Sequence, residues 1–146
     1  MTRFAPVFVA SFLLSIHFGA LLYVNSSLLG GFFEPSIVSL FFLLGAAGSV
    51  LIFLFAPKLI RRFGKRFLLL FSLILTTIST FSLALASSSS VIAVSFIIYA
   101  SLLPMIYYCL DIFLEELTLD AKTGEIRGIY LTILNLGIAL GPFVLA

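Results

Sequence analysis

Fourteen charged residues interrupt the 146-residue chain so unevenly that five stretches of 19 to 22 residues carry no charge. An α-helix rises about 1.5 Å per residue, so about 20 residues cross the roughly 30 Å hydrocarbon core of a bilayer. A charge at the centre of such a helix costs about 2.5–3.5 kcal/mol, which explains its exclusion. We therefore predict an all-α membrane protein with five transmembrane helices, at about residues 4–24, 36–57, 67–86, 91–113 and 128–146.

The composition excludes the common classes of soluble protein. Hydrophobic residues make up 62% of the chain and charged residues 10%, and the mean hydropathy is +1.31, whereas soluble domains carry about 25% charged residues. Soluble enzymes, nucleic-acid binders and disordered linkers are therefore excluded. No nucleophile–base pair, metal-ligand cluster or phosphate-binding loop stands out, so we expect no enzyme activity, cofactor or metal. The single cysteine, Cys109, is expected to pack rather than react.

The basic residues fall on one side of the predicted membrane. With alternating spans, the N-terminus and the gaps at 58–66 and 111–127 share a side, and they hold all eight Lys and Arg residues. The opposite side receives residues 25–35 and 87–90, whose only charge is Glu34. The positive-inside rule then predicts a cytoplasmic N-terminus and, for a bacterial-type protein, the cytoplasmic (inner) membrane. A cleaved signal peptide is the alternative for the first stretch, although its apolar run is longer than usual.

The gap between the second and third predicted helices is a short basic turn, in which Gly64 is able to form a positive-φ corner. Its simplest function is anchoring, because cations bind anionic headgroups. The turn also resembles the loop between helices two and three of the major facilitator superfamily, whose motif is Gly-x-x-x-Asp-Arg-x-Gly-Arg-Arg/Lys. The second half of that motif matches Arg62, Gly64, Lys65 and Arg66, whereas Pro57 and Arg61 stand where the family has its first Gly and its Asp.

The fifth uncharged stretch carries a second motif, made of glycines and a proline. It is similar to the fifth-helix motif of antiporters in the same superfamily, which closes with one more Gly where this chain has Leu145. The preceding Asp120 and Arg127 resemble the way the family begins helix five. The resemblance covers the whole chain, and the motif residues are Gly128, Gly137, Gly141 and Pro142, spaced Gly-x8-Gly-x3-Gly-Pro.

These glycines have a physical use in any helix. At 100° per residue Gly137 and Gly141 lie about 40° apart on one face, which lets another helix approach closely. Pro142 has no N–H for the carbonyl of Ile138, so we expect the helix to bend there. Ordinary helix packing explains such a face, and so does the rocking of helices during transport.

Six polar residues lie at positions where they could line a cavity within the membrane. Asn135 either bonds a neighbouring helix or faces a wet cavity, because an amide in hydrocarbon needs a partner. His17 is either a proton-coupling site or a neutral side chain bonded within the membrane. The resemblance implies that helices one and four line the substrate cavity, so the candidates are His17, Asn25, Ser101, Tyr107 and Tyr108, with Asn135 approaching from the side.

One departure from the family suggests a charge latch on the cytoplasmic side. The family pairs the acidic residue of its loop with a basic residue in helix four. Here the loop position is Arg61, and helix four supplies Asp111 and Glu115 instead. We hypothesise that the polarity is reversed, with Arg61 or Arg62 pairing with Asp111 or Glu115. A solvated helix end is the alternative explanation for Glu115.

These patterns lead to one expected function and two alternatives. The resemblance implies a secondary active transporter of small solutes that works by alternating access, with proton-driven export as the first expectation. Its partners would be membrane lipid, a small-molecule substrate and protons, and no nucleic acid. The alternatives are a small integral membrane subunit or assembly protein without transport activity, and a transporter of another family built from several small chains.

The length of the chain bears on the same question. Members of the suspected family have about twelve spans, built from inverted three-helix repeats. In that family, two three-helix repeats form an N-terminal six-helix bundle. The five helices predicted here amount to one complete repeat and a second repeat without its last helix. We therefore expect residues 1–146 to form a single partial transmembrane domain, with the remaining helices of a full-length transporter as further partners.

Overall fold

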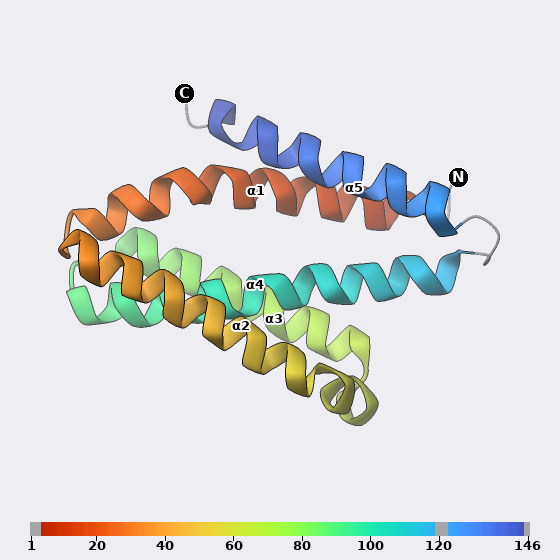
Figure 1. Ribbon diagram of the computed structural model, residues 1–146, viewed down its shortest axis with the longest axis horizontal. Helices are drawn as coiled ribbons and strands as arrows, with labels where there is room; N and C mark the ends of the chain where they lie inside the picture. Colours follow the sequence, from red (N-terminus) through yellow and green to blue (C-terminus); the bar gives the residue numbers. More distant parts are fainter. Residues whose placement is uncertain (1–3, 119–122, 145–146) are drawn as a thin grey trace. The chain divides into compact units, whose positions relative to one another are not determined.

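The computed structural model describes residues 4–118 and 123–144, and its regular structure there is helical. Within the described residues, five helices are long and apolar enough to cross a membrane, the last counted together with the short 3-10 helix that follows it. This confirms the prediction of an all-α chain with five candidate spans and supports an integral membrane protein. Figure 1 shows the elements in order: α1 (Ala5–Gly30), α2 (Pro35–Phe63), α3 (Lys65–Leu85), α4 (Ser89–Leu117), α5 (Thr123–Leu140) and the 3-10 helix η2 (Gly141–Val144).

Most of the helices extend beyond the uncharged stretches that predicted them. At α2, α4 and α5 the helix continues past the predicted span, because a charge is excluded from hydrocarbon but not from a helix, whose backbone keeps its hydrogen bonds beyond the membrane core. Residues 25–30, which extend α1, carry no charge. Residues 145 and 146, the end of the fifth predicted helix, lie outside the described residues, as does Asp120. The largest differences are α1 ending at Gly30 rather than Val24, α2 at Phe63 rather than Pro57, and α5 beginning at Thr123 rather than Gly128.

Proline and glycine set the two ends of α2. Pro35 occupies the first helical position, where its missing N–H costs nothing, and Glu34 before it is extended with φ −65° and ψ 152°. At the other end Gly64 has φ 81° and ψ 150°, a conformation essentially restricted to glycine. Its N–H donates to the carbonyl of Ile60 at 2.8 Å. The predicted positive-φ corner is therefore confirmed, and α3 begins at the next residue.

Helix α5 changes its hydrogen bonding where Pro142 was expected to disturb it. The α-helix ends at Leu140, and Gly141–Val144 continue as the tighter 3-10 helix η2. Pro142 cannot donate a backbone hydrogen bond, so a change of helix type at this point has a direct cause in the sequence.

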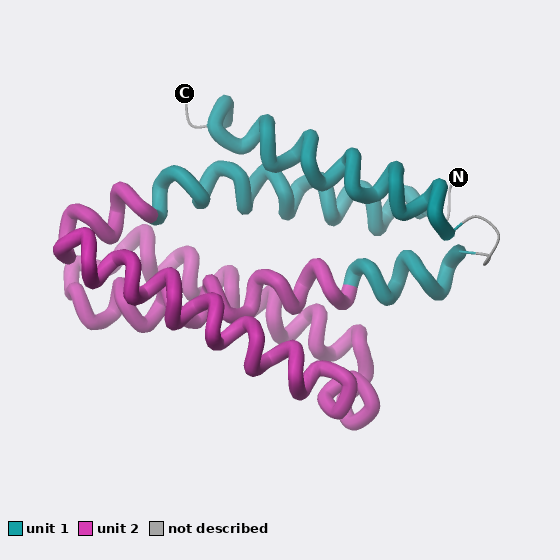
Figure 2. The backbone as a smooth tube through the Cα atoms, in the orientation of Figure 1, with its two compact units in different colours: residues 1–25, 110–146 teal, residues 26–109 magenta. Residues whose placement is uncertain are grey.

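The chain divides into two compact units, which Figure 2 shows in different colours. One unit consists of residues 26–109, and the other of residues 1–25 together with 110–146. The dividing points lie inside α1 and α4, so each of these helices contributes to both units.

Two apolar clusters hold α2, α3 and α4 together within the unit of residues 26–109. One lies toward the start of α2 and the other toward its end, and Cys109 is fully buried in the second. The first cluster comprises Leu29, Val38, Leu83, Ile92 and Phe96, and the second comprises Ala56, Leu68, Met105 and Cys109.

Helix α3 buries three of its hydroxyl-bearing side chains and exposes most of its large apolar ones, which is the reverse of a helix on a soluble protein. Ser72, Thr76 and Ser79 are buried, and the Thr76 hydroxyl donates to the carbonyl of Ser72 at 2.8 Å, which satisfies it within the helix. Hydrocarbon is the environment in which the opposite, apolar face is stable. The exposed side chains are Phe67, Leu70, Phe71, Ile74, Ile78 and Phe81.

Candidate functional site

Three charged side chains join α4 to α5 in the unit formed by residues 1–25 and 110–146. Nη2 of Arg127 lies 3.3 Å from Oδ2 of Asp111 and 3.4 Å from Oε2 of Glu115, and it donates to both carboxylates. The two carboxylates are four positions apart, so they share a face of α4. The side chains of Arg127, Asp111 and Glu115 are 43%, 38% and 63% exposed. Because solvent screens such exposed charges, each ion pair contributes only about 0–1 kcal/mol to the stability of the fold.

This charge cluster contains a cation that the latch hypothesis missed. The structure brings Asp111 and Glu115 together, but their described partner is Arg127. Pairing with Arg61 or Arg62 stays a prediction, because those two residues belong to the other unit. A signal for Arg127 was present in the sequence. Along the chain, Arg127 follows the connection between α4 and α5 by about as many residues as Asp111 precedes it. Residues that face each other across a helical hairpin are placed in this way.

Glycines bring α1 and α5 into close contact within the same unit. A Cβ atom added to Gly137 would lie 2.6 Å from Cβ of Ser15 and 2.8 Å from the carbonyl oxygen of Phe12. A Cβ atom on Gly141 would overlap the backbone of Gly19 in the same way. The predicted close approach of another helix to the Gly137–Gly141 face is therefore confirmed, and that helix is α1.

The opposite face of α5 is exposed. A Cβ atom on Gly128 would meet nothing within 4 Å. The Thr132 hydroxyl donates to the carbonyl of Gly128 at 2.9 Å, and Nδ2 of Asn135 donates to the carbonyl of Leu131 at 2.8 Å. Asn135 thus bonds its own helix, an option that the sequence analysis did not consider, and its contact with a wet cavity stays a prediction.

A second close helix contact joins α2 to α4 in the unit of residues 26–109. The Ser49 hydroxyl lies 3.0 Å from the carbonyl of Ala100 and 3.3 Å from that of Ser101. In the other direction, the Ser101 hydroxyl donates to the carbonyl of Gly45 at 3.3 Å. A Cβ atom on Gly48 would overlap the side chain of Ser101. Ser101, predicted to line a cavity, therefore faces α2.

The other cavity candidates occupy different surroundings. Asn25 is 5% exposed, whereas His17, Tyr107 and Tyr108 are half-buried. The ring of Tyr108 packs edge-to-face on Phe53 at a centroid distance of 5.8 Å. The six predicted candidates are divided equally between the two units. A common substrate cavity therefore stays a prediction.

The predicted loop motif forms the joint between α2 and α3. Arg61 and Arg62 lie in the last turn of α2, and Lys65 and Arg66 begin α3 after Gly64. The arginines are exposed, and the guanidinium carbon of Arg62 lies 5.4 Å from the ring centroid of Phe63.

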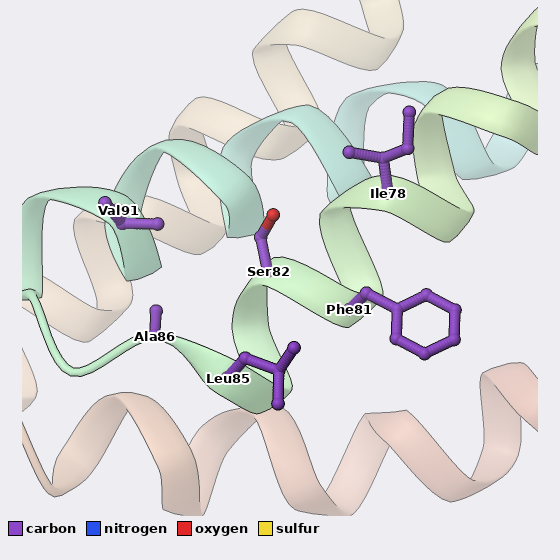
Figure 3. A pocket seen from close by; sticks show the side chains of 6 residues that line it. All are labelled: Ile78, Phe81, Ser82, Leu85, Ala86 and Val91. Carbon is purple, nitrogen blue, oxygen red and sulfur yellow. The ribbon is translucent and has the colours of Figure 1, made fainter.

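Two cavities in the unit of residues 26–109 are apolar. Figure 3 shows one of about 390 Å³ at the α3–α4 connection, lined by Ile78, Phe81, Ser82, Leu85, Ala86 and Val91. The other, of about 320 Å³, lies beside the α2–α3 joint and includes Phe63, Phe67 and Met105 in its wall. Neither cavity is lined by any of the six candidates for substrate contact.

No protein-family model, curated protein or solved structure matches this chain. What the protein does must therefore be inferred from the charge cluster, the glycine contacts and the basic joint. Among residues 4–118 and 123–144, no three His, Cys, Asp or Glu side chains lie close enough together to hold a metal ion.

Proposed function

We propose that this chain is the N-terminal part of a secondary active transporter of the major facilitator superfamily. It moves small solutes by alternating access, and protons drive the transport in the direction of export. The N-terminus, the α2–α3 joint and the charge cluster face the cytoplasm of a bacterial-type cell, across its inner membrane.

The observation that most supports this proposal is the contact of α5 with α1 through the glycines of the antiporter-like motif. Gly137 and Gly141 bring the backbone of α5 close to that of α1, and neither glycine has room for a Cβ atom. Small residues let two helices approach closely, and a contact of this kind gives one helix a surface against which the other can rock. Alternating access depends on movements of this kind between helices.

The charge cluster gives a second argument for the same proposal. A gate has to open in every transport cycle, so its closing contacts must be weak enough to break. The exposed pairs of Arg127 with Asp111 and Glu115 fit this requirement, since each is worth about 0–1 kcal/mol. In the proposed transporter they hold the cytoplasmic ends of α4 and α5 together in one of the two states.

Cysteine accessibility tests alternating access without knowledge of the substrate. Asn135→Cys and His17→Cys are introduced separately into the intact protein in its native membrane. Cys109 is fully buried and is left in place. A membrane-impermeant maleimide is added to right-side-out and inside-out vesicles, with and without an imposed pH gradient. We expect both cysteines to react from both sides, and the gradient to shift the reaction toward one side.

Two positions outside the uncharged stretches serve as controls. Ser88→Cys, between α3 and α4, and Lys58→Cys, near the end of α2, should each react from one side only, and from opposite sides. If the cysteines at 135 and 17 also react from a single side under every gradient, the proposal is wrong. A membrane subunit without transport activity would then be the better description.

A further inference from the structure

The apolar cavity beside the α2–α3 joint is built by three helices. Its volume is about 320 Å³, roughly ten times the space that one molecule occupies in liquid water. Leu59 and Phe63 of α2, Phe67 and Phe71 of α3, and Leu102 and Met105 of α4 are among its lining residues. A cavity with such walls favours hydrocarbon over water.

Three aromatic rings form an outer wall that begins at the joint. The ring centroids of Phe63 and Phe67 are 5.7 Å apart, and those of Phe67 and Phe71 are 6.0 Å apart with the planes at 14°. About half of each side chain is exposed. The rings therefore present a continuous apolar surface on which an extended acyl chain can lie.

The joint beside this cavity carries a positive charge that the acidic residues of the same unit do not balance. Residues 58–66 include five cations, whereas the only acidic residue in the unit of residues 26–109 is Glu34. Glu34 precedes α2, whose 29 residues put about 40 Å between its ends. The first turn of α3 contains no acidic residue. Within the unit of residues 26–109, no acidic residue is therefore close to the joint in the chain.

Two arginines of the joint are neighbours of residues that line the cavity. Arg62 places its guanidinium carbon 5.4 Å from the ring centroid of Phe63, which lines the cavity. Arg66 directly precedes Phe67, another lining residue. Both arginines are exposed, and no carboxylate in the described part of the chain pairs with either of them.

From this arrangement we infer that the cavity and the joint bind one anionic glycerophospholipid. An acyl chain lies along the phenylalanine wall, and the headgroup phosphate contacts Arg62 and Arg66. The cavity alone does not select a lipid, because the bilayer interior is equally apolar. Selection comes from the positive charge of the arginines, which favours a lipid of net negative charge over a zwitterionic one. This inference is independent of the proposed transport function.

Native mass spectrometry of the full-length protein in non-ionic detergent tests the inference. The protein is titrated with phosphatidylglycerol and with phosphatidylcholine of identical acyl chains. We expect phosphatidylglycerol to bind roughly tenfold more tightly, because the arginines attract its net negative charge. Glycerol 3-phosphate, which offers the phosphate without acyl chains, should not displace it. The double variant R62Q/R66Q should lose the preference, whereas R62K/R66K, which keeps both charges, should retain most of it.

A pair of cavity-filling variants separates the site from general effects on lipid binding. Leu102→Phe fills this cavity and should weaken phosphatidylglycerol binding several-fold. Val91→Phe fills the cavity of Figure 3, where residues 78–91 carry no charge, and should leave binding unchanged. Thermal unfolding establishes that each variant is folded. Equal affinity for the two lipids, an intact preference in R62Q/R66Q, displacement by glycerol 3-phosphate or equal effects of L102F and V91F would each overturn the inference.

Discussion

At Gly137 the backbone of α5 lies so close to α1 that hydrogen is the only side chain its position accepts. A Cβ atom would approach the carbonyl oxygen of Phe12 to 2.8 Å and Cβ of Ser15 to 2.6 Å. Neither neighbour is the flexible end of a long side chain, so neither can turn aside. One added methyl group therefore tests how far this contact stabilises the protein.

We expect Gly137→Ala to lower the free energy of unfolding by roughly 1–3 kcal/mol, because the added methyl group overpacks the α1–α5 contact. The measurement is unfolding of the purified protein by increasing SDS in mixed micelles. Gly128→Ala is the matched control on the same helix, where a Cβ atom meets nothing within 4 Å. It should raise stability by about 0.5–1 kcal/mol, since alanine favours the helix. Equal effects of the two substitutions would contradict the described contact.

Single residues also show the limit of sequence-based prediction of the site. The glycine spacing predicted a close helix contact at Gly137, because spacing alone puts small residues on one face. The partner of Asp111 and the packing of Ser101 against α2 depend on the register of one helix against another, which spacing within a single helix does not contain. Arg127 and Ser49 were missed as partners for that reason.

At the scale of the elements, the pattern of charges predicted the number of helices but not how far each helix continues beyond its apolar part. Charges mark where the hydrocarbon ends, whereas a helix ends where its backbone hydrogen bonds stop. Lys58, Arg61 and Arg62 therefore follow the apolar part of α2 without ending it. The end comes at Gly64, whose backbone conformation no other residue type adopts easily.

Replacing Gly64 is predicted to destabilise the α2–α3 joint. Gly64 has φ 81° and ψ 150°. Because a side chain is strained in this conformation, Gly64→Ala should lower the free energy of unfolding by about 1–3 kcal/mol. Asparagine should be no better, because its tolerance for positive φ applies to ψ values near +50°. Thermal unfolding in detergent measures both variants. Gly30→Ala, at the end of α1 with open space around its Cβ position, should change stability by less than about 0.5 kcal/mol. A Gly64→Ala variant as stable as Gly30→Ala would rule out the described corner.

At the scale of the whole molecule, the chain combines apolar helices with an asymmetric distribution of charge. All eight Lys and Arg residues lie near the N-terminus, at residues 58–66 or at residues 122–127, which share one side of the membrane if the helices alternate in direction. Such a bias sets the direction in which helices insert, because basic loops are retained on the cytoplasmic side.

Reporter fusions are expected to divide the connections into two groups. Alkaline phosphatase, which is active only outside the cytoplasm, should be inactive when fused after Gly64 and active when fused after Gly31 or Ser88. Green fluorescent protein fused at the same positions should give the complementary pattern. Phosphatase activity after Gly64, or equal activity at all three positions, would refute the orientation and with it the predicted cytoplasmic N-terminus.

The division into two units has a consequence for synthesis in the cell. Residues 26–109 are continuous in the chain, so α2, α3 and α4 can pack together as they leave the ribosome. Gly19 of α1, by contrast, meets Gly141 of α5, which is translated on the order of ten seconds later at about 5–20 residues per second. Until then the small-residue face of α1 has no partner within its own unit. Lipid or the insertion machinery must cover that face of α1 first, and α5 then has to displace the lipid or the machinery from it.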